Sequence, residues 1–267
     1  MDFFSIISRR QIALGAVCAL ILTLVLATAF SGASAATTAS GERLLPIYSV
    51  GREEDERIVS LSFDAAWGNE DTQTLIDILE RYGVKATFFV VGDWVEKYPE
   101  SVKALSDAGH EIMNHSDTHP HMSKLSREQI RQEIESCNDK IEAITDVRPT
   151  LFRAPYGEYC NELIEVLSEL GMYCIQWDID SLDWKDPTPA QISSRVCSMA
   201  GPGSICLFHN AALNTPAALP SIIEKLQADG CKLVPISQNI YYENYTIDHE
   251  GRQWPSAGLS PAVGGGE

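Results

Sequence analysis

Short runs of β-branched and aromatic residues alternate with longer amphipathic runs through most of this sequence, and this alternation constrains the fold more than any other feature. Runs such as RIVSLSFD (57–64) and KATFFVVG (85–92) are typical of buried strands. Further strand-like runs lie at 110–115, 150–155, 172–180, 203–210 and 232–237. Helical runs lie between them at 70–83, 99–109, 126–144, 161–171, 188–199 and 215–230. Strands that alternate with helices predict a parallel sheet covered by helices, so we predict an α/β fold, an irregular (β/α)7 barrel.

Two of the helical runs carry clear start signals. Ser126 and Gln129 have the spacing of a capping box at the start of the run 126–144. Thr188 is followed by Pro189, and proline is well tolerated at the first helical position. Both helices are therefore expected to begin at these residues.

The N-terminal segment is different in kind, because Arg9 and Arg10 directly precede an apolar run from Ile12 to Phe30. This pattern predicts an apolar helix that is either an export signal or a single membrane anchor. The length is close to the ~20 residues that span a bilayer, whereas ASA at 33–35 is suited to cleavage near Ala35. Under the positive-inside bias, everything after about residue 35 is expected outside the cytoplasm.

The remaining chain divides by composition into three parts. Residues 36–56 are polar and aperiodic and are predicted to be a linker, and residues 57–248 are predicted to form the folded domain. Residues 249–267 are rich in proline, glycine and serine and are predicted to be a disordered tail.

The net charge of −17 limits the partners. The first forty residues hold one acidic and two basic side chains, which leaves 36 acidic and 18 basic residues in the exported part, a net charge of −18. Such a surface repels polyanions, so a nucleic acid partner is not expected, whereas a neutral polymer such as an acetylated glycan is easier to accommodate. We expect a monomer whose only membrane contact is the N-terminal segment.

Cysteine spacing gives no metal motif. Cys18 lies in the apolar run, and six cysteines follow without any CxxC spacing. They are expected to be buried apolar residues or isolated disulfides, whose pairing the sequence leaves open.

Polar side chains that bear chemistry fall at the predicted ends of five strands. They are Asp64, His115 with His119, Arg153, the aspartates 178, 180 and 183, and His209. The carboxyl ends of parallel strands meet at one edge of the sheet, where the chemistry of such folds gathers. We therefore expect these side chains to converge.

The histidines His115 and His119 are spaced i, i+4, which allows both rings to face one metal ion. A stray pair of surface histidines is the alternative interpretation. His110 and His121, which lie before the strand and in the loop, are interpreted as ordinary polar residues.

The other strand-end residues each have a functional and a structural interpretation. Asp64 is either a general base or a cap of the following turn. Arg153 is a cation beside the site or the partner of a structural carboxylate, and His209 is a catalyst or a satisfied core histidine. The structural interpretation of the acidic loop is that two of its three aspartates, 178, 180 and 183, are solvated or act as caps. RAPYG (153–157) predicts an extended residue, then a turn that exposes backbone N–H groups near Tyr156.

Five sequence motifs occur in a set order: SFDAAWG (62–68), HSDTH (115–119), RAPYG (153–157), DSLDW (180–184) and LFH (207–209). Together they resemble those of the NodB-type polysaccharide deacetylases, carbohydrate esterase family 4, and within it the sporulation-associated deacetylases of endospore-forming bacteria. The resemblance spans residues 57 to 240. It implies the NodB-homology fold and hydrolysis of N-acetyl groups on amino sugars of an extracytoplasmic glycan. The expected glycan is peptidoglycan, modified during sporulation or wall remodelling.

Carried over residue by residue, the resemblance implies a role for each motif. His115 and His119 would bind a divalent metal, with zinc expected, and Asp64 would be the base. Arg153 would hold Asp64 ionised, while His209 would be the acid, oriented by Asp183. Three further residues would contact the acetyl group. The resemblance implies that the backbone N–H of Tyr156 contacts the oxyanion and that Trp184 and Leu207 line the acetyl pocket.

The chain departs from the family pattern at Ala65, where members have a second aspartate that completes the metal site. Two imidazoles alone make a poor zinc site, because catalytic zinc ordinarily has three protein ligands and a water. Three outcomes follow: Asp64 turns to the metal, one of Asn69, Glu70 and Asp71 supplies an oxygen, or the metal is weakly held. FDxxWG is the common form in the sporulation subgroup, which makes Ala65 a subgroup trait.

Three functions stay open on the sequence alone. A metal-dependent polysaccharide N-deacetylase is the first, and a catalytically weak glycan-binding protein of the same fold is the second, favoured by Ala65. A glycosidase that uses the aspartates of 178–183 is the third, and it leaves the histidine cluster without a role.

Overall fold

The computed structural model describes residues 42–256, and the compact unit that carries the sheet starts at Leu44. The predicted apolar run 12–30 and the cleavage site near Ala35 lie outside the described residues. Within the described part, no helix has both the length and the apolar character needed to cross a membrane.

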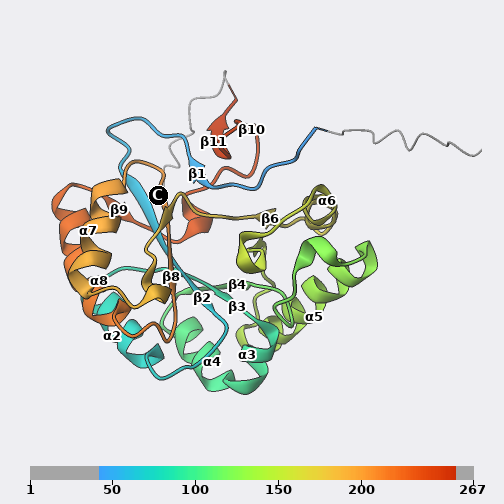
Figure 1. Cartoon of the computed structure of the whole chain (residues 1–267), viewed down its shortest axis with the longest axis horizontal. Helices are drawn as coiled ribbons and strands as arrows, with labels where there is room; N and C mark the ends of the chain where they lie inside the picture. Colours follow the sequence, from blue (N-terminus) through green and yellow to red (C-terminus); the bar gives the residue numbers. More distant parts are fainter. Residues whose placement is uncertain (1–41, 257–267) are drawn as a thin grey trace, which may run out of the picture. The chain divides into compact units, whose positions relative to one another are not determined.

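The centre of the unit is one parallel sheet (Figure 1). Within residues 42–256 it has eight strands, in the order β6-β5-β4-β3-β2-β8-β7, with β9 beside the start of β2. Their bounds are β2 (Ile58–Ala65), β3 (Thr87–Val90), β4 (Glu111–Asn114), β5 (Leu151–Phe152), β6 (Tyr173–Cys174), β7 (Ile179–Asp180), β8 (Ile205–His209) and β9 (Lys232–Leu233). The predicted α/β fold is therefore confirmed, as a curled sheet that the described strands leave open between β6 and β7.

Three phenylalanines pack against one another in the middle of this sheet. Phe63 on β2 is in register with Phe88 on β3 and Phe208 on β8. Its ring stacks on both neighbours, with centroids 4.8 Å and 5.5 Å apart. All three side chains are buried, which explains why these strands read as continuous apolar runs. The carboxyl ends of β2 and β8 are thereby fixed side by side.

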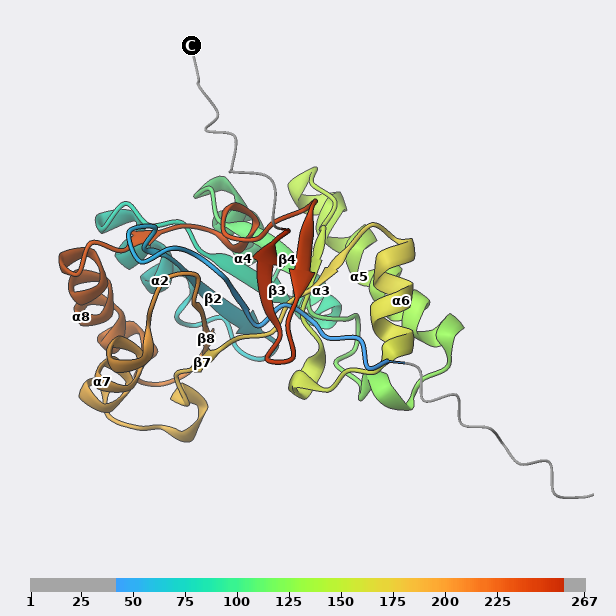
Figure 2. The same cartoon turned by 90° about the horizontal axis from the view of Figure 1, so that it is seen from above.

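Helices cover the sheet close to where the amphipathic runs predict them. Figure 1 and Figure 2 show α7 and α8 together on one flank and α5 and α6 together on the other. The bounds are α2 (Thr72–Arg81), α3 (Gly92–Lys97), α4 (Pro99–Asp107), α5 (Arg127–Thr145), α6 (Asn161–Glu169), α7 (Pro189–Met199) and α8 (Thr215–Ala228). Four 3₁₀ turns are η1 (Met122–Lys124), η2 (Pro155–Gly157), η3 (Asp183–Lys185) and η4 (Ile236–Gln238). The capping box of Ser126 and Gln129 is present, and Thr188 forms a second one with Gln191.

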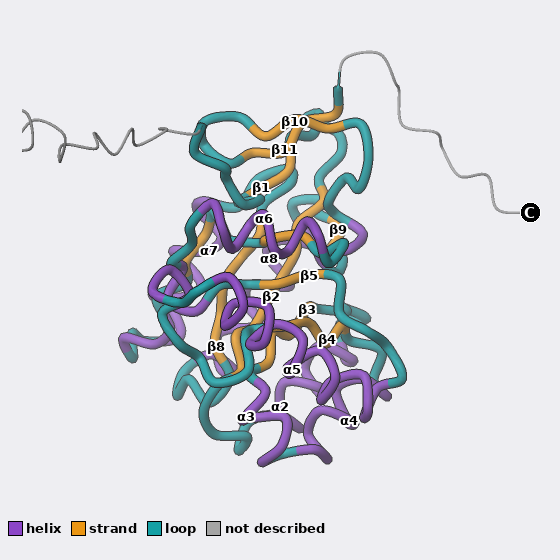
Figure 3. Tube along the Cα trace, turned by 90° about the vertical axis from the view of Figure 1, so that its right-hand side faces the viewer, coloured by secondary structure: helices purple, strands orange, loops and turns teal. Residues whose placement is uncertain are grey.

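The predicted linker and tail are wrong in part, because both contribute to a small second sheet (Figure 3). Its order is β1-β11-β10, formed by β1 (Ser49–Val50), β10 (Tyr245–Ile247) and β11 (Arg252–Pro255). Gln253 is buried and donates its side-chain amide to the Tyr241 carbonyl at 2.6 Å. Composition predicted irregular chain here, whereas these polar residues satisfy their backbone groups by pairing with distant segments.

Two further elements differ from the sequence prediction. The run predicted as one strand at 172–180 is two short strands at opposite ends of the sheet order, since β6 pairs with β5 and β7 pairs with β8. Between them Ile175 forms a bridge with Ile47. The helix α3 was not predicted, and it starts at Gly92, inside the run assigned to a strand. Trp94 of α3 is buried in the core. The six cysteines of the described part are free thiols, without a disulfide among them.

Candidate active site

A pocket of about 360 Å³, called the central pocket below, opens at the carboxyl edge of β2, β4 and β8. Eleven residues line it: Asp64, Trp67, His115, His119, Tyr156, Gly157, Trp177, Asp180, Trp184, Leu207 and His209. All five motifs of the sequence contribute to this lining, and Trp177 is the one lining residue outside them. The predicted convergence of strand ends is therefore what the structure contains.

Asp64 and Arg153 form the buried ionic pair of the site. Asp64, the penultimate residue of β2, is 5% exposed, and its Oδ1 accepts a hydrogen bond from Arg153 Nη1 at 2.8 Å. The Arg153 guanidinium is fully buried, and its Nη2 also donates to Ser62 Oγ at 2.9 Å. Burial alone raises the pKa of Asp64, but the charge of Arg153 and the nearby imidazoles bring it below its ordinary value. Asp64 is thus held as a carboxylate.

The imidazoles of His115 and His119 are in edge-on contact in the lining of the pocket, with ring centroids 5.0 Å apart. Nδ1 of His115 lies 2.8 Å from the Arg153 carbonyl oxygen, which only accepts, so Nδ1 carries the proton. Its Nε2 is left 3.5 Å from Asp64 Oδ2. Burial lowers the pKa of both histidines, that of His119 to about 4. Both rings are therefore neutral at neutral pH.

The loop that carries these histidines is bent, and helix α5 holds it in place. Ser116 and His119 have φ of 70° and 59°, values that cost strain for residues other than glycine. Glu133 of α5 accepts three hydrogen bonds from the loop: Asp117 N at 2.9 Å, Thr118 N at 2.8 Å and Thr118 Oγ1 at 2.8 Å. Sequence reasoning missed Glu133, because the sequence pattern of an amphipathic helix does not distinguish one glutamate from another.

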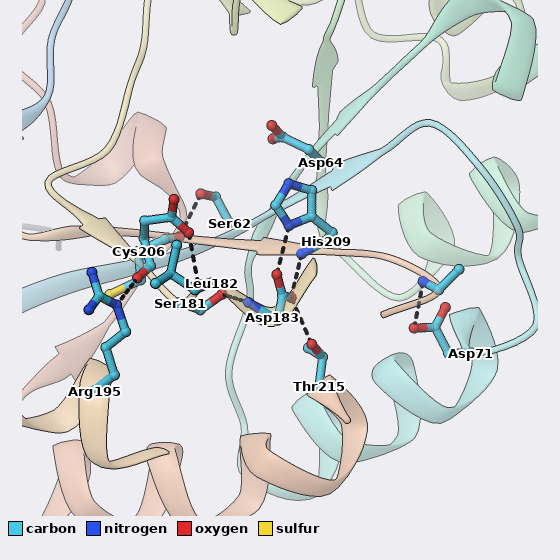
Figure 4. Close-up of polar contacts among 12 residues, drawn as sticks. Ser62, Asp64, Asp71, Ser181, Leu182, Asp183, Arg195, Cys206, His209 and Thr215 are labelled. Carbon is cyan, nitrogen blue, oxygen red and sulfur yellow. Dashed lines mark hydrogen bonds and ion pairs between the residues drawn. The ribbon is translucent and has the colours of Figure 1, made fainter. Parts of the chain in front are cut away.

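His209 and Asp183 form a second polar pair beside Asp64 (Figure 4). Nδ1 of His209 donates to Asp183 Oδ1 at 2.7 Å, and Thr215 Oγ1 donates to Asp183 Oδ2 at 2.7 Å. Burial lowers the pKa of His209, but the hydrogen bond and charge of Asp183 outweigh it and the pKa lies above its ordinary value. His209 is therefore suited to donate a proton from Nε2.

Aromatic side chains form the rim of the central pocket. Tyr156 sits in a 3₁₀ turn with φ of 61°, and the hydrogen bonds of that turn start from Gly157 N and Glu158 N, which leaves Tyr156 N–H outside them. Trp184 is exposed, and Leu207 forms part of the wall. Trp67, which sequence reasoning did not single out, lies against His119 and His209 with ring centroids 5.9 Å and 6.5 Å away.

The remaining sequence candidates lie elsewhere or do other work. Asp178 accepts from Ser204 Oγ and Ile205 N and does not line the central pocket. Asp180 lines it, although one of its oxygens caps Leu182 N. Of the three aspartates of 178–183 that the glycosidase hypothesis uses, only Asp180 lines the central pocket, so the acid and base pair is not assembled from them. His110 is buried directly before β4, where its Nδ1 accepts from Ala86 N, and His121 pairs with Glu158, and neither histidine lines the central pocket.

The residues present do not complete a metal site of the usual kind. Ala65 is fully buried in the apolar core. Two of the proposed substitute ligands are engaged elsewhere, since Asn69 donates to Ser101 Oγ and Asp71 accepts from Ala211 N. Glu70 lines a different pocket. In the described part of the chain, no three His, Cys, Asp or Glu side chains are gathered so as to hold a metal ion. Two imidazoles alone fall short of three protein ligands.

Comparison with known proteins places these observations in a family. Residues 51–175 match the family model described as polysaccharide deacetylase. The uncharacterised protein YlxY of Bacillus subtilis is 33% identical over 193 residues, 72% of this chain and 60% of YlxY. The peptidoglycan-N-acetylmuramic acid deacetylase PdaC of the same organism is 37% identical over 186 residues, 70% of this chain and 39% of PdaC. The chain thus spans less than two thirds of the length of these curated relatives.

Solved structures give the same result. The structure of PdaC superposes with a TM-score of 0.64 at 36% identity, covering 70% of this chain and 91% of the solved one. A carbohydrate esterase family 4 pseudoenzyme from Bacillus anthracis superposes with a TM-score of 0.70 at 36% identity, covering 74% and 69%. A mutant of that pseudoenzyme has restored enzymatic activity. From its motifs, its fold and these matches, the present chain belongs to the polysaccharide deacetylase family, carbohydrate esterase family 4.

Proposed function

We propose that this protein hydrolyses the N-acetyl group of an amino sugar in an extracytoplasmic glycan, and that the glycan is peptidoglycan. One observation carries the proposal: an ionised Asp64 and a proton-donating His209 flank the same pocket, each held by its own buried partner. The names of PdaC and of the deacetylases of Bacillus cereus and Listeria monocytogenes support peptidoglycan as the substrate.

The chemistry follows from the positions of the groups. Asp64 accepts a proton from a water molecule, whose oxygen attacks the acetamide carbonyl carbon. The oxyanion that develops is stabilised by the backbone N–H of Tyr156. His209 donates its proton to the sugar nitrogen as the carbon–nitrogen bond breaks, which releases acetate and the amino sugar. Arg153 and Asp183 act by keeping Asp64 ionised and His209 protonated.

Metal dependence, with zinc as the expected ion, belongs to this proposal and is to be measured. His115 and His119 are the residues that would hold a divalent ion, and no step above passes through it. Location outside the cytoplasm, by anchorage or secretion, and a role in sporulation or wall remodelling are likewise proposed, from the N-terminal segment and the motif subgroup.

A second candidate is a glycan-binding protein of the same fold that does not turn over. Ala65 favours it, because a methyl group in the apolar core stands where family members have a metal-binding carboxylate. Similarity to the Bacillus anthracis pseudoenzyme favours it as well.

One experiment separates the two candidates. Acetate release is measured from N-acetylglucosamine oligomers and from peptidoglycan, with and without zinc or cobalt, for the natural protein and for Ala65→Asp. Release by the natural protein supports the deacetylase, and release by Ala65→Asp alone supports the binding protein. The melting temperature with zinc gives a second readout. A buried carboxylate at position 65 lacks a partner without metal, so zinc should stabilise Ala65→Asp more than the natural protein.

A further inference from the structure

A second pocket, called the side pocket below, adjoins the central pocket. Its volume is about 420 Å³, and Trp67, Glu70, Asp93, Lys97 and Tyr98 are among its lining residues. Trp67 lines both pockets. The two spaces are therefore neighbours that share one aromatic wall, formed by the segment after β2, with α3 on the far side.

Trp67 is not held in place by a packing role in the core. Its side chain is 60% exposed, although a tryptophan gains more than most residues from burial. The backbone beside it is nevertheless fixed, because the carbonyl oxygen of Gly68 accepts hydrogen bonds from Trp94 Nε1 and from Asn210 Nδ2. An exposed ring on a fixed backbone is a preorganised contact surface for a ligand.

The side pocket has the mixed chemistry that a sugar ring needs. Trp67 and Tyr98 offer aromatic surface, and the ammonium of Lys97 lies 5.0 Å from the centroid of the Tyr98 ring. Glu70 and Asp93 add carboxylate oxygens to the lining, which can accept hydrogen bonds from hydroxyl groups. A few polar groups placed around an apolar surface are typical of small-molecule sites.

We propose that the side pocket is a second sugar subsite, in which the neighbouring sugar of the same glycan chain stacks on Trp67. This inference rests on the proposed glycan substrate. A polymer whose acetamide enters the central pocket must pass one of its walls, and the wall formed by Trp67 opens into a further pocket. Contact with His119 and His209 on one side and with the side pocket on the other makes Trp67 the residue that couples the two sugars.

The test is the chain-length dependence of binding, which does not require turnover. Affinities of the full chain for N-acetylglucosamine, its dimer and its tetramer are measured by titration calorimetry. The natural protein should bind the tetramer about tenfold more tightly than the monomer. Lys97→Ala and Asp93→Ala, which alter the side pocket alone, should weaken tetramer binding about tenfold and leave monomer binding unchanged. Trp67→Ala should weaken both.

Trp254→Ala is the matched control, because this exposed tryptophan lies on β11 and lines neither pocket. Its affinities should equal those of the natural protein. Equal binding of monomer and tetramer, or tetramer binding unaffected by Lys97→Ala and Asp93→Ala, overturns the subsite. Absence of binding to all three sugars overturns it too. Length-dependent binding without acetate release supports the subsite. That result counts only against the deacetylase function.

Discussion

Replacing Arg153 with methionine tests the ionic centre of the site most severely. The guanidinium has no exposed surface and pairs with a carboxylate that is 5% exposed. Removing it strands Asp64 as a buried charge and leaves Ser62 Oγ without its donor. Loss of one partner of a buried pair costs about 3–5 kcal/mol, so Arg153→Met should lower the free energy of unfolding by that amount at neutral pH.

Urea unfolding of four proteins measures this cost: the natural chain, Arg153→Met, Asp64→Leu and the double variant. Once both charges are absent, the burial penalty disappears, so the double variant should recover most of the stability that Arg153→Met loses. The matched control is Arg148→Met, whose partners Asp139 and Glu142 lie at the surface. An exposed pair contributes at most about 1 kcal/mol. If the losses of unfolding free energy in the two single variants add up strictly in the double variant, or if Arg153→Met and Arg148→Met lose equal stability, then Asp64 is not left as an unpaired buried charge.

Three more predictions follow from single contacts. Burial lowers the pKa of His110 to about 4 in the folded protein, against 6.5 for a free side chain, so the unfolded chain binds the proton first as pH falls. His110 should therefore contribute at most about 3 kcal/mol to a decline in stability between about pH 6.5 and pH 4, and His110→Asn should remove that share of the decline measured by urea unfolding. Asp183→Asn removes the group that raises the pKa of His209. The alkaline limb of the pH–rate profile should therefore move to lower pH, with a loss of about 10² or more in kcat. An unmoved alkaline limb would exclude His209 as the general acid. Glu133→Gln should speed amide exchange in residues 115–119, whereas Glu135→Gln on the same helix should not, and equal protection in both variants would show that Glu133 does not hold the loop.

The sequence predicted the main sheet because its strands are buried on both faces. Phe63, Phe88 and Phe208 make their strands continuously apolar, and the helices between them have strong start signals such as Ser126 with Gln129. Local pattern and overall fold agree at these positions. The order of the motifs along a parallel sheet then brought the strand-end residues to one edge, which is why the candidate site was predictable as a set.

Features that depend on contacts between distant residues were not predictable. The strand β11 pairs with β1 across about 200 residues of chain, and neither segment has a strand-like pattern of its own. Glu133 is likewise unremarkable in sequence, and Trp67 belongs to the first motif without a role of its own there, because their roles come from the loop and the pockets that the fold brings to them. Asn69 and Asp71 do not replace the carboxylate missing at Ala65, which is also a result of geometry, since both are near in sequence but engaged elsewhere.

The central claim is that Asp64 and His209 act on one acetamide group from two sides of the same pocket. Its most direct measurement is the acetate that the purified protein releases from the N-acetylglucosamine tetramer at neutral pH, beside Asp64→Asn. The account predicts many acetate molecules per protein molecule and a loss of orders of magnitude in the variant. Bound tetramer with no acetate above the uncatalysed rate, at every concentration of added zinc or cobalt, would contradict it.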